Sequence, residues 1–269
     1  MPPPLVIDSL DDPRVADYQH IADHQHMLDR GLFIAEGRLV VRRLLDLRHW
    51  DVESILLTPA ALENLGDVIH LATAPIYLVD QALMNAIAGF NIHRGCLALA
   101  RREKVAASTA VEALTLPIGP LSRVLVLEGV NNPDNVGGLF RTAAAFGVEL
   151  VVLGPSCGDP LYRKAIRTSM AATLVVPFVH APLWPDAIAD LRTDGFTVAA
   201  LTPRHDAMPL RDLPADAKLA LLVGAEGDGL TETAMAAATA RVCIPMTQAV
   251  DSLNVTTAAS IAMYHCWQD

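Results

Sequence analysis

The feature that most constrains the fold is a regular alternation of short apolar runs and helix-like segments in the second half of the chain. Strands are predicted at 124–127, 150–153, 173–178, 197–201, 219–223 and 241–244. Helices are predicted between and after them, at 136–146, 161–170, 186–192, 231–238 and 255–267. Such an alternation is typical of an α/β domain with a mostly parallel sheet covered by helices on both faces.

The same alternation predicts where a ligand would bind. In open parallel sheets, ligands bind beyond the carboxyl ends of the strands. Three loops after predicted strands carry polar residues, and two of them carry glycines; they follow Leu127, Val223 and Ile244. We therefore take these three loops as the candidate site.

A smaller α/β module is predicted ahead of this one. It has a helix-start signal at Asp12-Pro13, an apolar helical pattern from Leu39 to Leu45, and short apolar runs at 54–57, 76–79 and 97–100. The predicted organisation is a first domain over 1–105, a linker over 106–121 and a second domain over 122–269.

Composition narrows the class of protein. Hydrophobic residues make up 52% and charged residues 19% of the 269 positions, which excludes a disordered chain. Charges interrupt the apolar runs before they reach membrane-spanning length, and no secretory signal is expected. The four cysteines form no Cys-x-x-Cys pair, so a reduced, cytoplasmic protein is predicted. The net charge of −10 requires that any nucleic acid meet a local basic patch.

The first loop has the composition of a capped strand-to-helix connection. It runs from Glu128 through Asn131-Asn132-Pro133-Asp134 to Asn135, which is predicted to cap the following helix. That helix carries Arg141. Taken alone, an ordinary capped loop with a solvent-facing arginine explains these residues equally well.

The second and third loops are more unusual. The second, Gly224-Ala225-Glu226-Gly227-Asp228-Gly229, allows close backbone approach to a ligand, but its Gly-x-x-Gly-x-Gly spacing fails the dinucleotide fingerprint. This counts against a nicotinamide-dependent dehydrogenase, the reading that the α/β pattern alone would permit. The third loop ends in Ser252-Leu253-Asn254, where Ser252 or Asn254 is predicted to cap a helix rich in small residues.

The ordered combination of these motifs resembles one family. Asn-Pro-Asp-Asn-Val-Gly-Gly-Leu-Phe-Arg, Val-Gly-Ala-Glu-Gly-Asp-Gly-Leu and Ile-Pro-Met-x₅-Ser-Leu-Asn-Val follow one another between residues 132 and 255. This pattern resembles the SpoU-type branch of the SPOUT RNA methyltransferases. Residues 33–45 more weakly resemble the L30e-like substrate-binding domain that precedes the catalytic domain in this family.

The resemblance implies a fold and a reaction. The second domain would thread a trefoil knot, a rare feature that composition cannot reveal. The chain would be a homodimer that transfers a methyl group from S-adenosylmethionine to a ribose 2′-hydroxyl of RNA, with ribosomal RNA favoured over transfer RNA. The implied catalytic residues are Asn135, Arg141, Glu226, Ser252 and Asn254. The implied donor-binding residues are Leu201, Val223, Gly224, Ile244, Met246 and Leu253.

Physical chemistry refines the role of Arg141. The family resemblance casts it as a general base, but a guanidinium in a protein stays charged. We predict instead that Arg141 clamps an RNA phosphate beside the target ribose and stabilises the developing alkoxide, while a phosphate oxygen or water takes the proton. Ser252 and Asn254 would orient Arg141 or the ribose, and Glu226 would pair with a cation or hold its loop.

Basic residues for an RNA patch are few. The candidates are Arg163, Lys164 and Arg167 on one predicted helix, and Arg38 and Arg42 on another. The principal alternatives to a ribosomal RNA enzyme are a transfer RNA 2′-O-methyltransferase and a non-catalytic RNA-binding or ribosome-assembly factor that keeps the fold.

The chain departs from the family pattern at three places. Gln248 and Ala171 occupy positions where the family usually has glycine. Gln248 predicts a different loop path near the donor. His20, His24 and His26 stand where basic residues are frequent, and a solvated surface is favoured over a metal site there because no third ligand is apparent.

Overall fold

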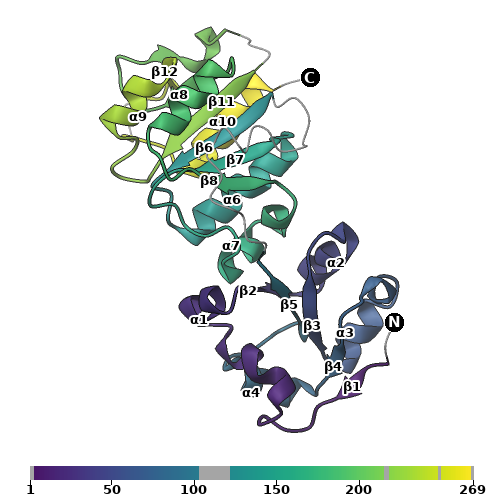
Figure 1. Cartoon of the computed structure of the whole chain (residues 1–269). Coiled ribbons are helices and arrows are strands. Elements are labelled where there is room, and N and C mark those ends of the chain that lie inside the picture. Colours follow the sequence, from purple (N-terminus) through teal and green to yellow (C-terminus); the bar gives the residue numbers. More distant parts are fainter. Residues whose placement is uncertain (1–2, 103–121, 215–217, 248–249, 268–269) are drawn as a thin grey trace. The chain divides into compact units, whose positions relative to one another are not determined.

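The computed structural model describes residues 3–102, 122–214, 218–247 and 250–267, which form two compact units (Figure 1). The first unit holds residues 3–102 and 161–174; the second holds 122–160 and the described residues after 174. The predicted linker at 106–121 lies outside the described residues. The predicted domain boundaries stay a prediction.

The first unit is a mixed α/β module. Its sheet has the order β1-β4-β3-β5-β2, in which β5 runs antiparallel to β2 and β3, while β1, β4 and β3 are parallel. The strands are β1 Leu5–Val6, β2 Leu32–Glu36, β3 Val52–Leu57, β4 Ile76–Leu78 and β5 Cys96–Arg101. The helices are η1 Pro13–His20, α1 His24–Asp29, α2 Arg38–Leu47, α3 Pro59–Asn64, η2 Ile69–Leu71, α4 Gln81–Ala88, α7 Arg163–Thr168 and η3 Ala172–Leu174.

The predicted helix start at Asp12-Pro13 is confirmed. Asp12 caps η1 by accepting a hydrogen bond from the Arg14 amide, and Pro13 occupies the first turn, where its missing N–H is harmless. The helix buries Tyr18, whose hydroxyl lies 2.9 Å from the Ser54 hydroxyl in the core. A buried phenol with a hydrogen-bond partner avoids the penalty of an unsatisfied polar group.

The second unit is built on a wholly parallel sheet of order β10-β12-β9-β11-β6-β7-β8, as the sequence predicts (Figure 1). The strands are β6 Arg123–Glu128, β7 Leu150–Leu153, β8 Phe178–His180, β9 Thr197–Leu201, β10 Met208–Pro209, β11 Leu219–Gly224 and β12 Ala240–Cys243. The helices are α6 Pro133–Ala145, α8 Asp186–Thr193, η4 Leu210–Asp212, α9 Glu232–Ala237 and α10 Val255–Cys266.

Helices cover both faces of this sheet. Side chains of α8 and α9 pack on one face, where Val126 and Leu222 are completely buried. Helices α6 and α10 pair with each other, and α10 also contacts β11. Burial of each such aliphatic side chain contributes roughly 1.5–3 kcal/mol, so two buried faces suit strands that are apolar throughout.

The order of the strands reverses beside β6. The chain continues from β6 outward to β7 and β8, then crosses back to build β9, β11 and β12 on the other side of β6. A reversal of this kind separates the loops at the carboxyl ends of neighbouring strands and opens a crevice between them. The three loops singled out from the sequence lie at this edge.

Two local predictions are wrong. Helix α6 is capped by Asn132 rather than Asn135, because Pro133 suits the first helical position and Asn132 accepts a hydrogen bond from the Asp134 amide. The predicted strand at 173–178 is instead the short helix η3 followed by β8, which begins at Phe178. Pro177 has no N–H to donate to a ladder, and the strand starts directly after it.

Among the described residues, no helix is both long and apolar enough to span a membrane. The trefoil knot and the L30e-like character of the first unit stay predictions.

Candidate active site at the carboxyl edge of the sheet

A cavity of about 340 Å³ lies at the carboxyl edge of the second unit's sheet. Its walls are the residues that follow β9, β11 and β12, together with the start of α10. The lining residues are Leu201, Thr202, Pro203, Val223, Gly224, Ala225, Glu226, Gly227, Gly229, Ile244, Met246, Ser252, Leu253, Asn254, Val255 and Ala258. This size falls within the range typical of small-molecule pockets.

All six residues predicted to hold a donor line this cavity: Leu201, Val223, Gly224, Ile244, Met246 and Leu253. They come from four separate segments that only the fold brings together. Their roles stay predictions, since a lining position does not identify a ligand. Gln248 lies outside the described residues, so the path predicted for its loop is not tested.

The glycine-rich loop folds back on its own strand. A Cβ at Gly224 would lie only 2.4 Å from the carbonyl carbon of Gly229, so no larger residue fits there. The loop closes by a bridge between Ala225 and Gly229, where the Gly229 amide donates to the Ala225 carbonyl at 3.1 Å. Gly227 and Gly229 have φ of +89° and +69°, which glycine adopts without strain. Both glycines line the cavity.

Asn254 connects two of the candidate loops with the start of α6. Its side-chain amide donates to Asn135 Oδ1 at 3.0 Å and to Glu226 Oε1 at 2.5 Å. Its Oδ1 accepts from the amides of Thr256 and Thr257, so it caps α10 as one of the two sequence alternatives proposed. Asn254 thus uses both its donors and its acceptor within the protein.

Close packing of α6 against α10 holds Asn135 and Asn254 together. A Cβ at Gly138 would lie 2.9 Å from the Thr256 methyl group, so glycine allows the two helices to approach. Thr256 also donates to the Asn135 carbonyl at 3.4 Å, and the hydroxyls of Thr142 and Ser260 lie 3.1 Å apart. Asn135 is buried, with 7% of its surface exposed.

The remaining two candidate catalytic residues differ in position. Ser252 lines the cavity and is exposed. Arg141 is exposed on α6 but does not line the cavity; six residues separate it from Asn135, about 120° around the helix axis. Within the part of the chain that the structure describes, no hydrogen bond or ion pair engages its guanidinium. The structure therefore joins Asn135, Glu226 and Asn254 and leaves Arg141 apart.

The predicted RNA-contact residues all lie in the first unit. Arg163 donates to Glu36 at 2.8 Å and lies over the Phe90 ring, while Arg167 lies 3.6 Å from the same carboxylate. Arg42 is paired with Asp67. Arg38 and Lys164 are partly exposed. Glu36 and Asp67 thus already neutralise much of the charge of the three paired arginines.

The three histidines near the start of the first unit, His20, His24 and His26, do not form one cluster. The His20 and His26 rings lie 4.3 Å apart, whereas His24 meets the edge of the Tyr162 ring at 4.7 Å. Within the described residues, no group of three or more His, Cys, Asp or Glu side chains is placed to bind a metal ion.

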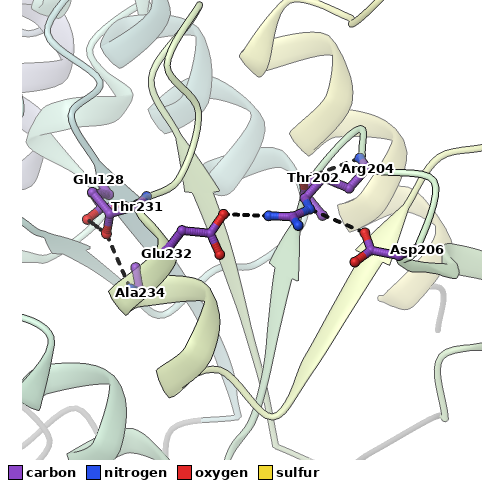
Figure 2. Close-up of polar contacts among 7 residues, drawn as sticks. All are labelled: Glu128, Thr202, Arg204, Asp206, Thr231, Glu232 and Ala234. Carbon is purple, nitrogen blue, oxygen red and sulfur yellow. Dashed lines mark hydrogen bonds and ion pairs between the residues drawn. The ribbon is translucent and has the colours of Figure 1, made fainter.

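The loop after β9, which is not among the three loops predicted from the sequence, supplies Thr202 and Pro203 to the cavity wall. Figure 2 shows how this loop is fastened: Arg204 pairs with Glu232 at 2.5 Å and with Asp206 at 3.2 Å. The hydrogen bond to Glu232 raises the pKa of the Arg204 guanidinium above its usual value. The carboxyl-end rule, applied to the predicted strand at 197–201, would have found this loop.

Comparison with known proteins identifies the family. The family model described as the SpoU rRNA methylase family matches residues 122–264. The chain belongs to this family. An uncharacterized tRNA/rRNA methyltransferase of Mycobacterium bovis is 41% identical over 263 residues, which cover 94% of this chain and 88% of the relative. A relative of the same description from Mycobacterium tuberculosis is 40% identical over the same coverage.

Solved structures share the fold of this SpoU-family chain. An AdoMet-bound rRNA methyltransferase from Sinorhizobium meliloti superposes with a TM-score of 0.81 at 21% identity, over 97% of each chain. The SpoU methyltransferase AviRb from Streptomyces viridochromogenes, solved with the cofactor AdoMet, gives a TM-score of 0.80 at 19% identity, over 95% of this chain and 97% of its own. At these identities the likeness establishes the fold alone.

Proposed function

We propose that this chain transfers a methyl group from S-adenosylmethionine to a ribose 2′-hydroxyl of structured RNA. The observation that carries the proposal is the hydrogen-bonded set of Asn135, Glu226 and Asn254, of which Glu226 and Asn254 line the cavity built from the second and third motifs and Asn135 belongs to the first. Membership of the SpoU family supports RNA methylation in general. The choice of the ribose hydroxyl rests on the family resemblance of these residues.

The cavity fits the chemistry of the donor. Leu201, Val223, Ile244, Met246 and Leu253 offer apolar surface to an adenine ring, and Gly224 with its loop offers backbone groups to polar atoms of the nucleoside. Glu226 is the carboxylate among the lining residues, where a cationic donor would be favoured. The donor supplies a methyl group on a positively charged sulfur, which is already electrophilic.

Arg141 is proposed to hold the RNA rather than the donor. It stays charged, is exposed, and has no ion pair among the described residues, so its fork of donors is available to a phosphate. A phosphate clamped beside the reacting ribose fixes the hydroxyl and stabilises the alkoxide as its proton leaves to a phosphate oxygen or water.

The hydrogen bonds of Asn254 refine the roles predicted for the other residues. Its donors go to Asn135 and Glu226 and its acceptor caps α10, so we assign it to holding the loops in register. Glu226 accepts from Asn254 and holds its loop against α10. Ser252 lines the cavity, and its hydroxyl has no hydrogen-bond partner among the described residues, so it is the candidate to orient the ribose.

RNA binding by the first unit is proposed for Arg38, Arg42, Arg163, Lys164 and Arg167. Asp67 pairs with Arg42, and Glu36 pairs with both Arg163 and Arg167. Reversing the charge of Arg167 should weaken RNA binding and flatten its salt dependence, because each lost phosphate contact reduces counterion release.

A homodimer through the second unit is also proposed. Helix α10 exposes Ile261 and Tyr264, with 39% and 62% of their surfaces accessible, and Tyr264 meets Phe146 at the end of α6. Large exposed apolar side chains on a paired helix surface favour a protein interface. The cytoplasm is the proposed compartment and ribosomal RNA the preferred substrate.

Mapping of 2′-O-methylated nucleotides tests the proposal. Total RNA from a strain lacking the gene is compared with RNA from its parent by resistance of the neighbouring phosphodiester to alkali. Loss of one site in ribosomal RNA is expected. Loss of a site in transfer RNA would favour the transfer RNA alternative, and no lost site would favour the non-catalytic factor.

A further inference from the structure

We propose that Glu128 is a positioning residue that closes the glycine-rich loop and thereby shapes the donor cavity. Glu128 is the last residue of β6, is 4% exposed, and does not line the cavity. Its carboxylate reaches the residue at which the loop ends, Thr231 (Figure 2). The expected effect of Glu128 on donor binding rests on the proposed function.

Glu128 contacts the loop at both ends. In the parallel ladder its backbone is in register with Gly224, where the loop leaves β11. Its side chain accepts hydrogen bonds from the Thr231 amide at 2.9 Å and the Thr231 hydroxyl at 2.8 Å. Residues 225–230, which include Glu226, therefore form a loop whose two ends are both held by Glu128. Fixing both ends of a short loop removes much of its conformational freedom.

The same loop end is tied to a second wall of the cavity. Thr231 caps α9 by accepting from the Ala234 amide, and the next residue, Glu232, pairs with Arg204 (Figure 2). Arg204 in turn belongs to the loop that carries Thr202 into the cavity. Release of Thr231 from Glu128 would therefore loosen the glycine-rich loop where it is joined to the rest of the site.

The chemistry of the contact requires a carboxylate. Oε1 of Glu128 accepts from Trp184 Nε1 at 2.6 Å and from the Thr231 hydroxyl, while Oε2 accepts from the Thr231 amide. In the nearly isosteric Glu128→Gln, the new NH₂ group must face either the Trp184 N–H or the Thr231 N–H. In either orientation one donor of this part-buried cluster loses its acceptor.

The chain offers a matched control at the opposite end of the same strand. Oε2 of Glu149 accepts from the amides of Ser122 and Arg123 and from the Ser122 hydroxyl, at the start of β6. Each of the two carboxylates accepts hydrogen bonds from one or two backbone amides and from a side-chain hydroxyl at one end of β6. Of the two, Glu128 is the one that contacts the end of the glycine-rich loop. Glu149→Ala thus destabilises the same strand without touching the loop.

The test measures two quantities on the full chain. In the ligand-free protein, hydrogen–deuterium exchange of a peptide covering 224–231 should accelerate roughly tenfold in Glu128→Gln. Calorimetry should show S-adenosylmethionine binding weakened by a similar factor. Glu149→Ala should lower the unfolding temperature but leave both readouts near wild type. Thr231→Val should reproduce the effect of Glu128→Gln, and Thr231→Ser should restore wild-type behaviour.

Each outcome decides the proposal. Wild-type exchange in the 224–231 peptide of Glu128→Gln and Thr231→Val would overturn it, as would faster exchange with unchanged donor affinity. Equal loosening by Glu149→Ala would also overturn it, since Glu128 would then act only on overall stability. If even the wild-type protein fails to bind the donor, the proposed function fails, and the exchange data alone decide whether Glu128 closes the loop.

Discussion

Asn254 donates its side-chain amide to Asn135 Oδ1 across 3.0 Å, which joins the starts of α10 and α6. The same amide reaches Glu226 in the glycine-rich loop. One side chain thus holds three of the predicted catalytic elements in a fixed relation, and it also caps a helix. Substitutions that separate these two tasks are the most informative.

Asn254→Asp should keep the cap but break the connection between the loops. An aspartate still accepts from the Thr256 and Thr257 amides, but its second oxygen would face the Glu226 carboxylate and Asn135 Oδ1. We expect S-adenosylmethionine affinity to fall roughly tenfold or more, with most stability retained. Calorimetry and thermal unfolding measure the two effects.

Asn254→Ala supplies the comparison, because it loses the cap as well and should cost about 1 kcal/mol of additional stability. Asp80→Ala, which removes the cap of α4 in the first unit, controls for the loss of a cap alone. Wild-type donor affinity in Asn254→Asp would contradict the role assigned to Asn254.

Arg141→Ala should abolish turnover and leave donor binding intact. Arg141 does not line the donor cavity, so its removal should change the S-adenosylmethionine affinity by less than about twofold, while kcat falls by about 10²–10³. Single-turnover transfer of labelled methyl groups measures the rate. Arg211→Ala removes an exposed arginine from the same unit and should retain activity. Near-normal turnover in Arg141→Ala would rule out the phosphate clamp.

Gly224→Ala should destroy the cavity far more effectively than Gly227→Ala. The first substitution places a Cβ 2.4 Å from the Gly229 backbone, whereas a Cβ at Gly227 meets nothing within 4 Å and is disfavoured only by its positive φ. That conformation costs about 1–2 kcal/mol. Donor binding should be lost in the first variant and weakened in the second. Equal affinities would show that the close approach at Gly224 is not needed.

The buried thiol of Cys96 should make the free energy of unfolding decrease as the pH rises above 9. Burial raises the pKa of the Cys96 thiol from 9.0 to about 12. Between these values the unfolded chain loses a proton that the folded protein keeps, so the free energy of unfolding falls as pH rises. The full effect is about 1.4 kcal/mol per pH unit. Urea unfolding at pH 8–11 should show a steeper decline for wild type than for Cys96→Ala, and parallel declines would contradict this assignment.

The fold was largely predictable because its signal is local. The strands at 150–153 and 197–201 have the boundaries predicted from apolar runs alone. The run at 173–178 is also apolar, but the strand predicted there is wrong. The strand β8 begins only at Phe178, directly after a proline, which has no N–H to donate to the sheet. Asn135 misled it in a different way: Pro133 fixed the helix start earlier, which moved Asn135 from the cap into the buried first turn.

The candidate site was predictable as a set of residues but not as a set of contacts. The lining positions of Leu201 and Met246 follow from strand ends and motif order. The partners of Arg163 do not, because its carboxylate, Glu36, lies 127 positions away in the chain. Glu128 was visible only as the charge that ends an apolar strand, and its contact with Thr231 depends on the pairing of β6 with β11.

We propose that this SpoU-family chain methylates a ribose hydroxyl and that the cavity at the carboxyl edge is its donor site. The most direct test incubates the protein with RNA and S-adenosylmethionine labelled on the methyl group, then digests the RNA to nucleosides. We expect label in a 2′-O-methylnucleoside, reduced label at a limiting donor concentration with Asn254→Asp, and none with Gly224→Ala. Label in a base-methylated nucleoside, or undiminished transfer by both variants, would contradict it.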